Sequence, residues 1–128
     1  HSNGAAIAVE AARQGLDIEL LIVLSPALKV NTRFPPNIKR IIVLYTPYDV
    51  PTKVARIADK IPFIRLFVPN AWGAMGARGA KYNEDQLPKY LDKRVANIEA
   101  KDVHGHSHWF KEKERTVYGE LIEKWTNS

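Results

Sequence analysis

The apolar residues of this chain gather in two short runs that are almost without interruption. The runs occupy residues 18–24 and 38–45, and each ends before a segment that contains proline. A continuous apolar run of this length is typical of a parallel strand covered on both faces. We therefore expect these two segments to be core strands of one sheet, with a third core strand at residues 94–101.

Three other segments have the composition or spacing of helices. Residues 4–14 are rich in alanine and end before Gly15, a residue type that commonly follows a helix. Residues 51–61 begin with proline, which suits the first position of a helix, and place four apolar side chains on one face: Val54, Ile57, Ala58 and Ile61. Residues 109–125 place six on one stripe: Phe110, Val117, Tyr118, Leu121, Ile122 and Trp125.

Helical and strand patterns alternate along the chain, which predicts an α/β fold with a mostly parallel sheet and helices on both faces. Its first element is a helix without a preceding strand. Three parallel strands alone would leave a long apolar edge unpaired. We therefore expect the sheet to continue into polypeptide that is not present in this sequence.

Residues 62–92 fit this alternation least well. Residues 64–68 are compatible with a strand or an extended loop, and residues 72–80 form a glycine-rich stretch that we interpret as a loop. The stretch lacks the Gly-Lys-Ser/Thr ending of a phosphate-binding loop. The segment is longer than a helix-strand unit requires, so we interpret it as an insertion.

Composition excludes several classes of protein. A chain of 128 residues with 45% hydrophobic content is one globular domain or part of one. It contains no cysteine, and no apolar run approaches the roughly 20 residues of a transmembrane helix. The net charge of +5 comes from scattered basic residues, so we expect no nucleic-acid surface. The sequence leaves the cellular compartment open.

Three polar residues stand where an acyl-transfer site would need them. The opening His-Ser-Asn-Gly matches the later part of G-x-S-x-G, the nucleophile elbow that exposes a serine between a strand and a helix. Such a serine needs a base and an acid that orients the base. In parallel sheets these groups lie on loops beyond the carboxyl ends of strands. Ser2, Asp49 and His106 all meet that condition.

The chain resembles the C-terminal half of an α/β-hydrolase that starts inside the nucleophile elbow. The resemblance covers nearly all of residues 1–128, and the serine, aspartate and histidine occur in the order of that family. It implies that Ser2 is the nucleophile, His106 the base and Asp49 the orienting acid, with the backbone N–H of Asn3 in the oxyanion hole. The second oxyanion donor would come from the absent half.

The same resemblance implies a serine hydrolase that cleaves a carboxylic ester, as esterases and lipases do, with no metal or organic cofactor. The substrate would be a small-molecule or lipid ester. The insertion at residues 62–92 would cover the site, with Trp72, Met75 and Tyr82 lining an acyl or leaving-group pocket. These 128 residues alone are expected to be inactive. The alternative is a non-catalytic structural or interaction module that keeps the fold.

Each candidate also has a simpler interpretation. Ser2 could cap a helix, and Asp49 could open a turn. The other aspartates considered for the acid do not directly follow a convincing strand: Asp59, Asp85, Asp92 and Asp102. His104 and His108 are alternatives for the base. The alternation of His104, His106 and His108 also permits a zinc site, although Gly105 favours a loop.

Overall fold

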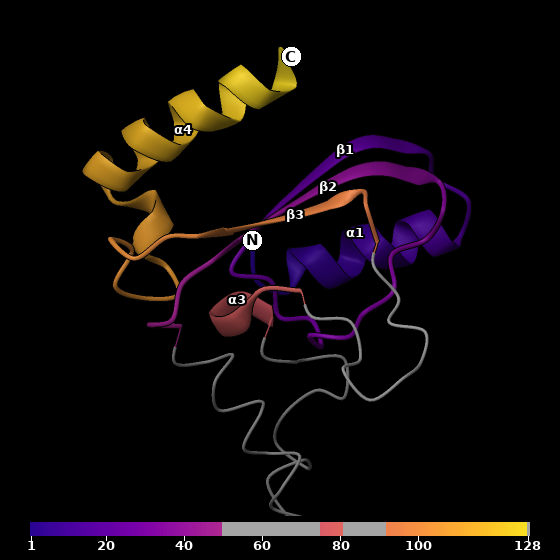
Figure 1. Cartoon of the computed structure of the whole chain (residues 1–128), viewed down its shortest axis with the longest axis horizontal. Helices are drawn as coiled ribbons and strands as arrows, with labels where there is room; N and C mark the ends of the chain where they lie inside the picture. Colours follow the sequence, from indigo (N-terminus) through magenta and orange to yellow (C-terminus); the bar gives the residue numbers. More distant parts are fainter. Residues whose placement is uncertain (50–74, 81–91, 128) are drawn as a thin grey trace, which may run out of the picture.

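A three-stranded parallel sheet forms the centre of the computed structural model (Figure 1), which describes residues 1–49, 75–80 and 92–127. The strands are β1 (Ile18–Leu24), β2 (Ile38–Tyr45) and β3 (Val95–Glu99). They lie in the order β1-β2-β3 with β2 in the middle. The predictions for residues 18–24 and 38–45 are confirmed, and the third strand is shorter than the predicted 94–101.

Side chains alternate between the two faces of the sheet, as the pleat of a strand requires. In the register, Leu21 pairs with Ile41 and Val23 with Val43, and these four residues belong to one hydrophobic cluster. Ile22 pairs with Ile42 and Leu24 with Leu44, and these four contribute to the other. Both faces of the sheet are apolar for this reason, which explains the nearly continuous hydrophobic runs.

Helices α1 (Gly4–Arg13) and α3 (Met75–Arg78) cover one face of the sheet (Figure 1). The buried side chains of α1 are small: Ala5, Val9 and Ala12. Small side chains allow the helix axis to approach the strands closely. Helix α1 ends one residue before the predicted Gln14, and Gly15 then adopts a positive φ of 107°.

Helix α4 (Glu112–Thr126) covers the opposite face (Figure 1). The sequence predicted a single helix from Trp109, and this prediction was wrong at its start. A short 3-10 helix, η2 (His108–Phe110), precedes α4 and buries Trp109. Tyr118, Leu121 and Trp125 pack toward the sheet as expected, whereas Phe110 and Val117 of the predicted stripe are exposed to 55% and 49%. The break at Lys111, whose backbone is extended, rotates Phe110 out of the stripe.

Part of the glycine-rich stretch is not a loop. Residues 75–78 form the turn of helix α3, and Met75, Gly76 and Ala77 are buried. Gly79 follows with a φ of +73°, and a Cβ atom there would lie 2.9 Å from the side-chain oxygen of Asn97. The Asn97 amide donates to Ala80 O and accepts from Ala80 N–H. This part of the predicted insertion therefore belongs to the core.

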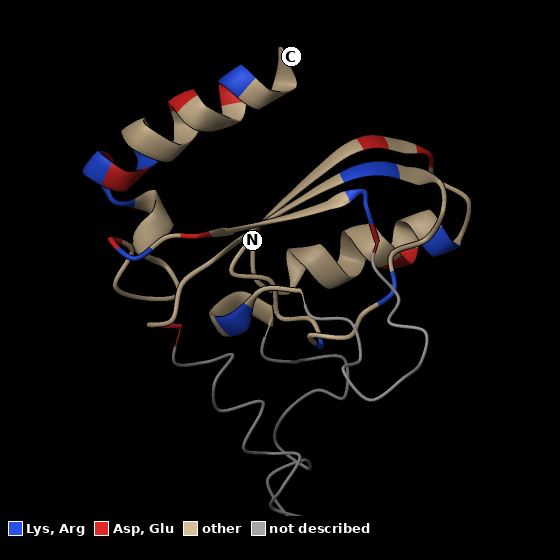
Figure 2. Cartoon of the chain, in the orientation of Figure 1, with Lys and Arg blue, Asp and Glu red and all other residues tan. Residues whose placement is uncertain are grey.

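The predicted helix at residues 51–61 and the ambiguous segment at 64–68 lie outside the described residues. In the part of the chain that the structure describes, no helix is both long and apolar enough to cross a bilayer. Figure 2 shows acidic and basic residues interspersed on α1, α4 and the strands.

Candidate functional site

Ser2 lies in a strained turn at the carboxyl end of the sheet. Its φ is +52°, in the left-handed region that a serine rarely adopts, and α1 begins two residues later. The Ser2 N–H donates to Leu24 O at 3.1 Å, and Ser2 O accepts from Ala27 N–H at 3.1 Å. These bonds fix the turn against the end of β1.

The turn lies on the edge of β1 that faces away from β2. Ser25 N–H donates to Leu44 O of β2, and successive residues of a strand direct their polar groups to opposite edges. The carbonyl of Leu24 therefore points to the outer edge, where Ser2 binds it. Ser2 therefore lies beside the carboxyl end of β1 and just before the start of α1. The nucleophile elbow stays a prediction, because β1 follows α1 in the chain and does not lead into Ser2.

Asp49 lies four residues beyond β2 and is fully buried. Its N–H donates to Thr46 O at 3.1 Å, and the Tyr48 N–H donates to the Thr46 hydroxyl at 3.3 Å. The turn after β2 is therefore closed by its own hydrogen bonds. It holds the carboxylate of Asp49 below the surface, with Tyr48 exposed beside it.

His106 lies in the segment that follows β3, and two bonds connect this segment to the end of β2. Ala100 N–H donates to Tyr45 O at 2.8 Å, and the buried hydroxyl of Thr46 donates to Val103 O. The turn that carries Asp49 and the loop that carries His106 are thus joined through Thr46. Thr46 was not singled out in the sequence, because a threonine after a strand has no distinctive signature.

The three predicted residues meet in one chain of hydrogen bonds. His106 Nε2 lies 2.7 Å from Ser2 Oγ. His106 Nδ1 lies 2.8 Å from both carboxylate oxygens of Asp49. Residues separated by 104 and 57 positions in the sequence are brought together at the carboxyl ends of the strands.

This geometry assigns the protons on the imidazole. An ionised carboxylate can only accept hydrogen bonds, so Nδ1 of His106 carries the hydrogen that faces Asp49. In the neutral ring Nε2 is then an acceptor, directed at the Ser2 hydroxyl. The His106 side chain is 17% exposed and that of Asp49 is 0% exposed, so the ion pair that forms when His106 is protonated is largely shielded from water.

Asn3 is the N-cap residue of α1 and directly follows Ser2. The positive end of the α1 dipole therefore lies beside the Ser2 hydroxyl, where it favours negative charge. A backbone N–H at this position is of the kind that oxyanion holes use. The role of the Asn3 N–H in an oxyanion hole, which the sequence resemblance implied, stays a prediction.

A second buried contact supports the loop that carries His106. The indole N–H of Trp109 donates to the hydroxyl of Ser25 at 2.7 Å, with both residues buried. Ser25 has a φ of +43° at the end of β1, so it is also in a strained conformation. The sequence assigned Trp109 only to a helix and Ser25 only to the end of a strand, and nothing in their spacing indicated this contact.

Of the residues expected to line a substrate pocket, the structure describes Met75 alone. Met75 has 0% exposure and packs in the cluster between the sheet and α1. Its N–H donates to Leu28 O at 3.0 Å. Trp72 and Tyr82 lie outside the described residues.

The other histidines have separate surroundings. The ring of His104 lies 4.8 Å from that of Tyr48, and the ring of His108 lies against Gly105. Among the described residues, no group of three His, Cys, Asp or Glu side chains is placed to hold a metal ion. Of these three histidines, His106 is the one hydrogen bonded to both Ser2 and Asp49, at 2.7 and 2.8 Å.

The competing aspartates also lie elsewhere. Asp92 is paired with Arg94 before β3, and Asp102 accepts a hydrogen bond from the Tyr118 hydroxyl at 2.5 Å. Asp59 and Asp85 lie outside the described residues. Of the aspartates that the structure describes, Asp49 is the one hydrogen bonded to His106.

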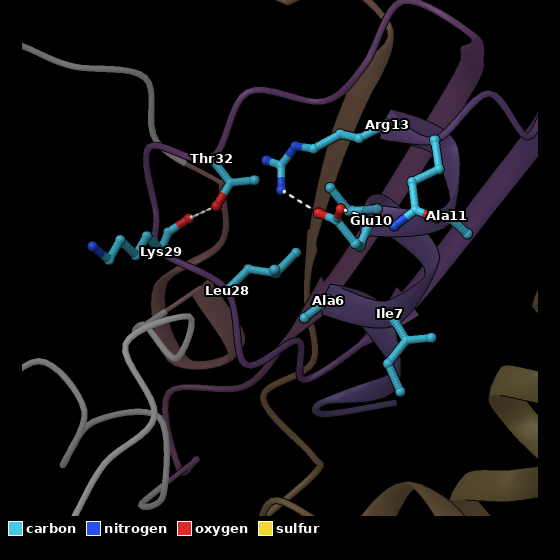
Figure 3. A pocket seen from close by; sticks show the side chains of 10 residues that line it. Ala6, Ile7, Glu10, Ala11, Arg13, Leu28, Lys29 and Thr32 are labelled. Atoms are coloured by element: carbon cyan, nitrogen blue, oxygen red, sulfur yellow. Dashed lines mark hydrogen bonds and ion pairs between the residues drawn. The ribbon is translucent and has the colours of Figure 1, made fainter. Parts of the chain in front are cut away.

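A pocket of about 700 Å³ lies between α1 and residues 28–32 (Figure 3). Ile7, Ala6 and Leu28 give it apolar walls, and the Glu10–Arg13 ion pair lies at its edge. Ser2, Asp49 and His106 are not among its lining residues.

Comparisons of the chain with models of known protein families, with curated proteins and with solved structures gave no match. The interpretation of the site therefore depends on its geometry.

Proposed function

We propose that this protein is a serine hydrolase that cleaves a carboxylic ester through an acyl-enzyme. The observation that carries the proposal is the hydrogen-bonded series Ser2–His106–Asp49, with contacts of 2.7 and 2.8 Å. A serine is a weak nucleophile until a neighbouring base accepts its proton, and a base is effective when a third group fixes its tautomer. Both conditions are supported by the contacts of His106.

In the first half of the proposed reaction, Ser2 Oγ attacks the ester carbonyl carbon as its proton passes to His106 Nε2. The negative charge that develops on the carbonyl oxygen lies near the start of α1 and the Asn3 N–H. His106 then donates the proton to the departing alkoxide oxygen as the carbon–oxygen bond breaks. The alcohol leaves, and the acyl group remains on Ser2.

In the second half, water takes the place of the alcohol. His106 accepts a proton from the water as the water oxygen attacks the acyl carbon. It then returns that proton to Ser2 Oγ as the bond between Oγ and the acyl carbon breaks, and the carboxylic acid leaves. The carboxylate of Asp49 stabilises the imidazolium that forms in each half and stays ionised. Every step uses groups of this chain and water.

The test uses a fluorophosphonate probe, which phosphonylates activated serines, on the intact polypeptide that contains these 128 residues. We expect labelling at Ser2, located by peptide mass spectrometry, and complete loss of labelling in Ser2→Ala. Ser107→Ala is the matched control, because Ser107 is an exposed serine directly after His106 and should leave labelling unchanged.

A folded intact protein that is not labelled would contradict the proposal and favour the alternative of a non-catalytic module.

A second experiment, hydrolysis of p-nitrophenyl esters of increasing acyl length, gives the substrate range. A burst of nitrophenol equal to the enzyme concentration, abolished in Ser2→Ala, is the kinetic signature expected of the acyl-enzyme.

A further inference from the structure

The residue before the candidate nucleophile also contacts the candidate base. The Nε2 atom of His1 lies 2.7 Å from the main-chain oxygen of His106. The His1 ring lies 4.8 Å from the His106 ring and 5.0 Å, edge to face, from the ring of Phe110. His1 is partly buried between these two aromatic groups.

The direction of this hydrogen bond follows from its acceptor. A carbonyl oxygen can only accept, so His1 Nε2 carries a hydrogen and donates it. Two adjacent residues therefore hold His106 at two points: His1 binds its main-chain oxygen, and Ser2 binds its ring. Asp49 provides the third contact, on the other ring nitrogen.

We propose that His1 is a positioning residue, whose N–H fixes the main chain of His106 so that the imidazole stays aimed at Ser2. The inference rests on the proposed function and assigns a role to a position that the motif leaves variable. His106 lies outside the strands, so no sheet hydrogen bond fixes its main chain, and the bond from His1 supplies a main-chain restraint beside the two contacts to the ring. A misplacement of about 1 Å at a reacting group can lower a rate by about 100-fold.

Two substitutions separate the hydrogen bond from the packing of the ring. His1→Phe keeps an aromatic ring between His106 and Phe110 but removes the donor. His1→Gln removes the ring and keeps an N–H at the same number of bonds from Cα. His108→Phe makes the same chemical change as His1→Phe at a ring that lies against Gly105, and it is the matched control.

Ester hydrolysis by the intact protein is the first measurement. We expect His1→Phe to lower kcat by about 10- to 100-fold with little change in KM, since substrate binding does not depend on the alignment of His106. We expect His1→Gln to retain kcat within about threefold and His108→Phe to match the wild type. Equal kcat in His1→Phe and wild type would overturn the proposal, as would a His1→Gln variant that is as slow as His1→Phe.

A second measurement does not require activity. The His106 Nδ1–H that faces Asp49 should give a far-downfield proton resonance, identified by its loss in Asp49→Asn. We expect this resonance to persist in wild type, His1→Gln and His108→Phe, and to broaden beyond detection in His1→Phe as the ring moves and exchanges with water. A sharp resonance in folded His1→Phe would overturn the role of His1, whereas absence of probe labelling at Ser2 would overturn only the proposed function.

Discussion

At the scale of single residues, the carboxylate of Asp49 determines which nitrogen of His106 carries a proton. It accepts from Nδ1 while fully buried, so Nε2 is left to accept from Ser2. An amide at position 49 can present an N–H to Nδ1 instead. The imidazole would then adopt the other tautomer, in which Nε2 carries hydrogen and cannot act as a base.

We therefore expect Asp49→Asn to lower kcat by about 10³- to 10⁴-fold, with the protein still folded. Steady-state hydrolysis of a p-nitrophenyl ester measures the loss, and circular dichroism checks the fold. Asp102→Asn is the control, because Asp102 also lies just beyond the carboxyl end of a strand. It weakens the bond to Tyr118 and is expected to change stability and leave kcat unchanged. A fully active Asp49→Asn would contradict the role of Asp49.

Backbone strain at two serines is a second feature at the scale of single residues. Ser2 and Ser25 are the described non-glycine residues with positive φ, and both lie at the carboxyl end of β1. Such conformations cost of order 1–3 kcal/mol and persist only where the surroundings enforce them. At Ser2 the left-handed turn allows its hydroxyl to meet His106, and at Ser25 it accompanies the bond to Trp109.

At the scale of elements, the contact between Ser25 and Trp109 joins the end of β1 to η2. The indole N–H is buried and donates to the Ser25 hydroxyl. Ser25→Ala would leave that donor without this acceptor, and an unsatisfied buried donor costs about 1–3 kcal/mol. We expect a loss of this size in the free energy of unfolding, measured by urea denaturation.

Control variants test whether the cost of Ser25→Ala comes from its direct contact with Trp109. Ser107→Ala, at an exposed serine, should change stability by less than about 0.5 kcal/mol. Trp109→Phe removes the donor, so adding Ser25→Ala to it should cost less than Ser25→Ala alone. Additive costs in the double variant would contradict a direct interaction between the two side chains.

The elements that the sequence predicted best are those with a strong hydrophobic pattern. The strands at residues 18–24 and 38–45 agree with the structure to the residue. Both faces of each strand pack against a hydrophobic cluster, so the apolar run is nearly continuous, with charged residues only near its start. The start of the last helix was wrong, because the aromatic residues Trp109 and Phe110 extended its stripe by chance. The hydrophobic periodicity of the sequence does not indicate the extended backbone at Lys111, which separates η2 from α4.

The convergence of Ser2, Asp49 and His106 could be anticipated because each follows or precedes a recognisable element. The contacts that hold these residues could not. The side chains of His1 and Thr46 donate to main-chain oxygens, and the indole of Trp109 donates to a single hydroxyl. Such partners depend on three-dimensional proximity. The burial of Met75 was missed for a related reason, since a glycine-rich stretch indicates a loop unless its packing is known.

At the scale of the whole molecule, the two ends of the sheet have different roles. The carboxyl end carries the candidate site, and the amino end is braced by Arg94. Its guanidinium donates to Phe34 O and Pro35 O in the segment before β2, at 2.9 and 2.7 Å, and to the carbonyl oxygen of Ile38, the first residue of β2, at 2.5 Å. It also pairs with the Asp92 carboxylate at 2.7 Å, so it joins the segments that lead into β2 and β3.

This brace makes stability depend on pH. Hydrogen bonds from Arg94 hold the pKa of Asp92 below its ordinary value of 3.8, and they outweigh the opposing effect of burial. Because the pKa is lower in the folded state, the unfolded state binds the proton first as the pH falls. The contribution of Asp92 to stability is complete well above this ordinary pKa and is lost as the pH falls through the lower native pKa.

Asp92→Asn should therefore lower the free energy of unfolding at pH 6 and flatten its decline as the pH falls below about 4. Urea titrations of wild type and variant at several pH values measure the difference. Asp17→Asn, at an exposed aspartate, should leave the decline as steep as in the wild type. An equally steep decline in Asp92→Asn would mean that Arg94 stabilises the amino end through the three carbonyl oxygens alone. Because this brace and the candidate site lie at opposite ends of the strands, Asp92→Asn should leave kcat near neutral pH unchanged wherever the protein is folded.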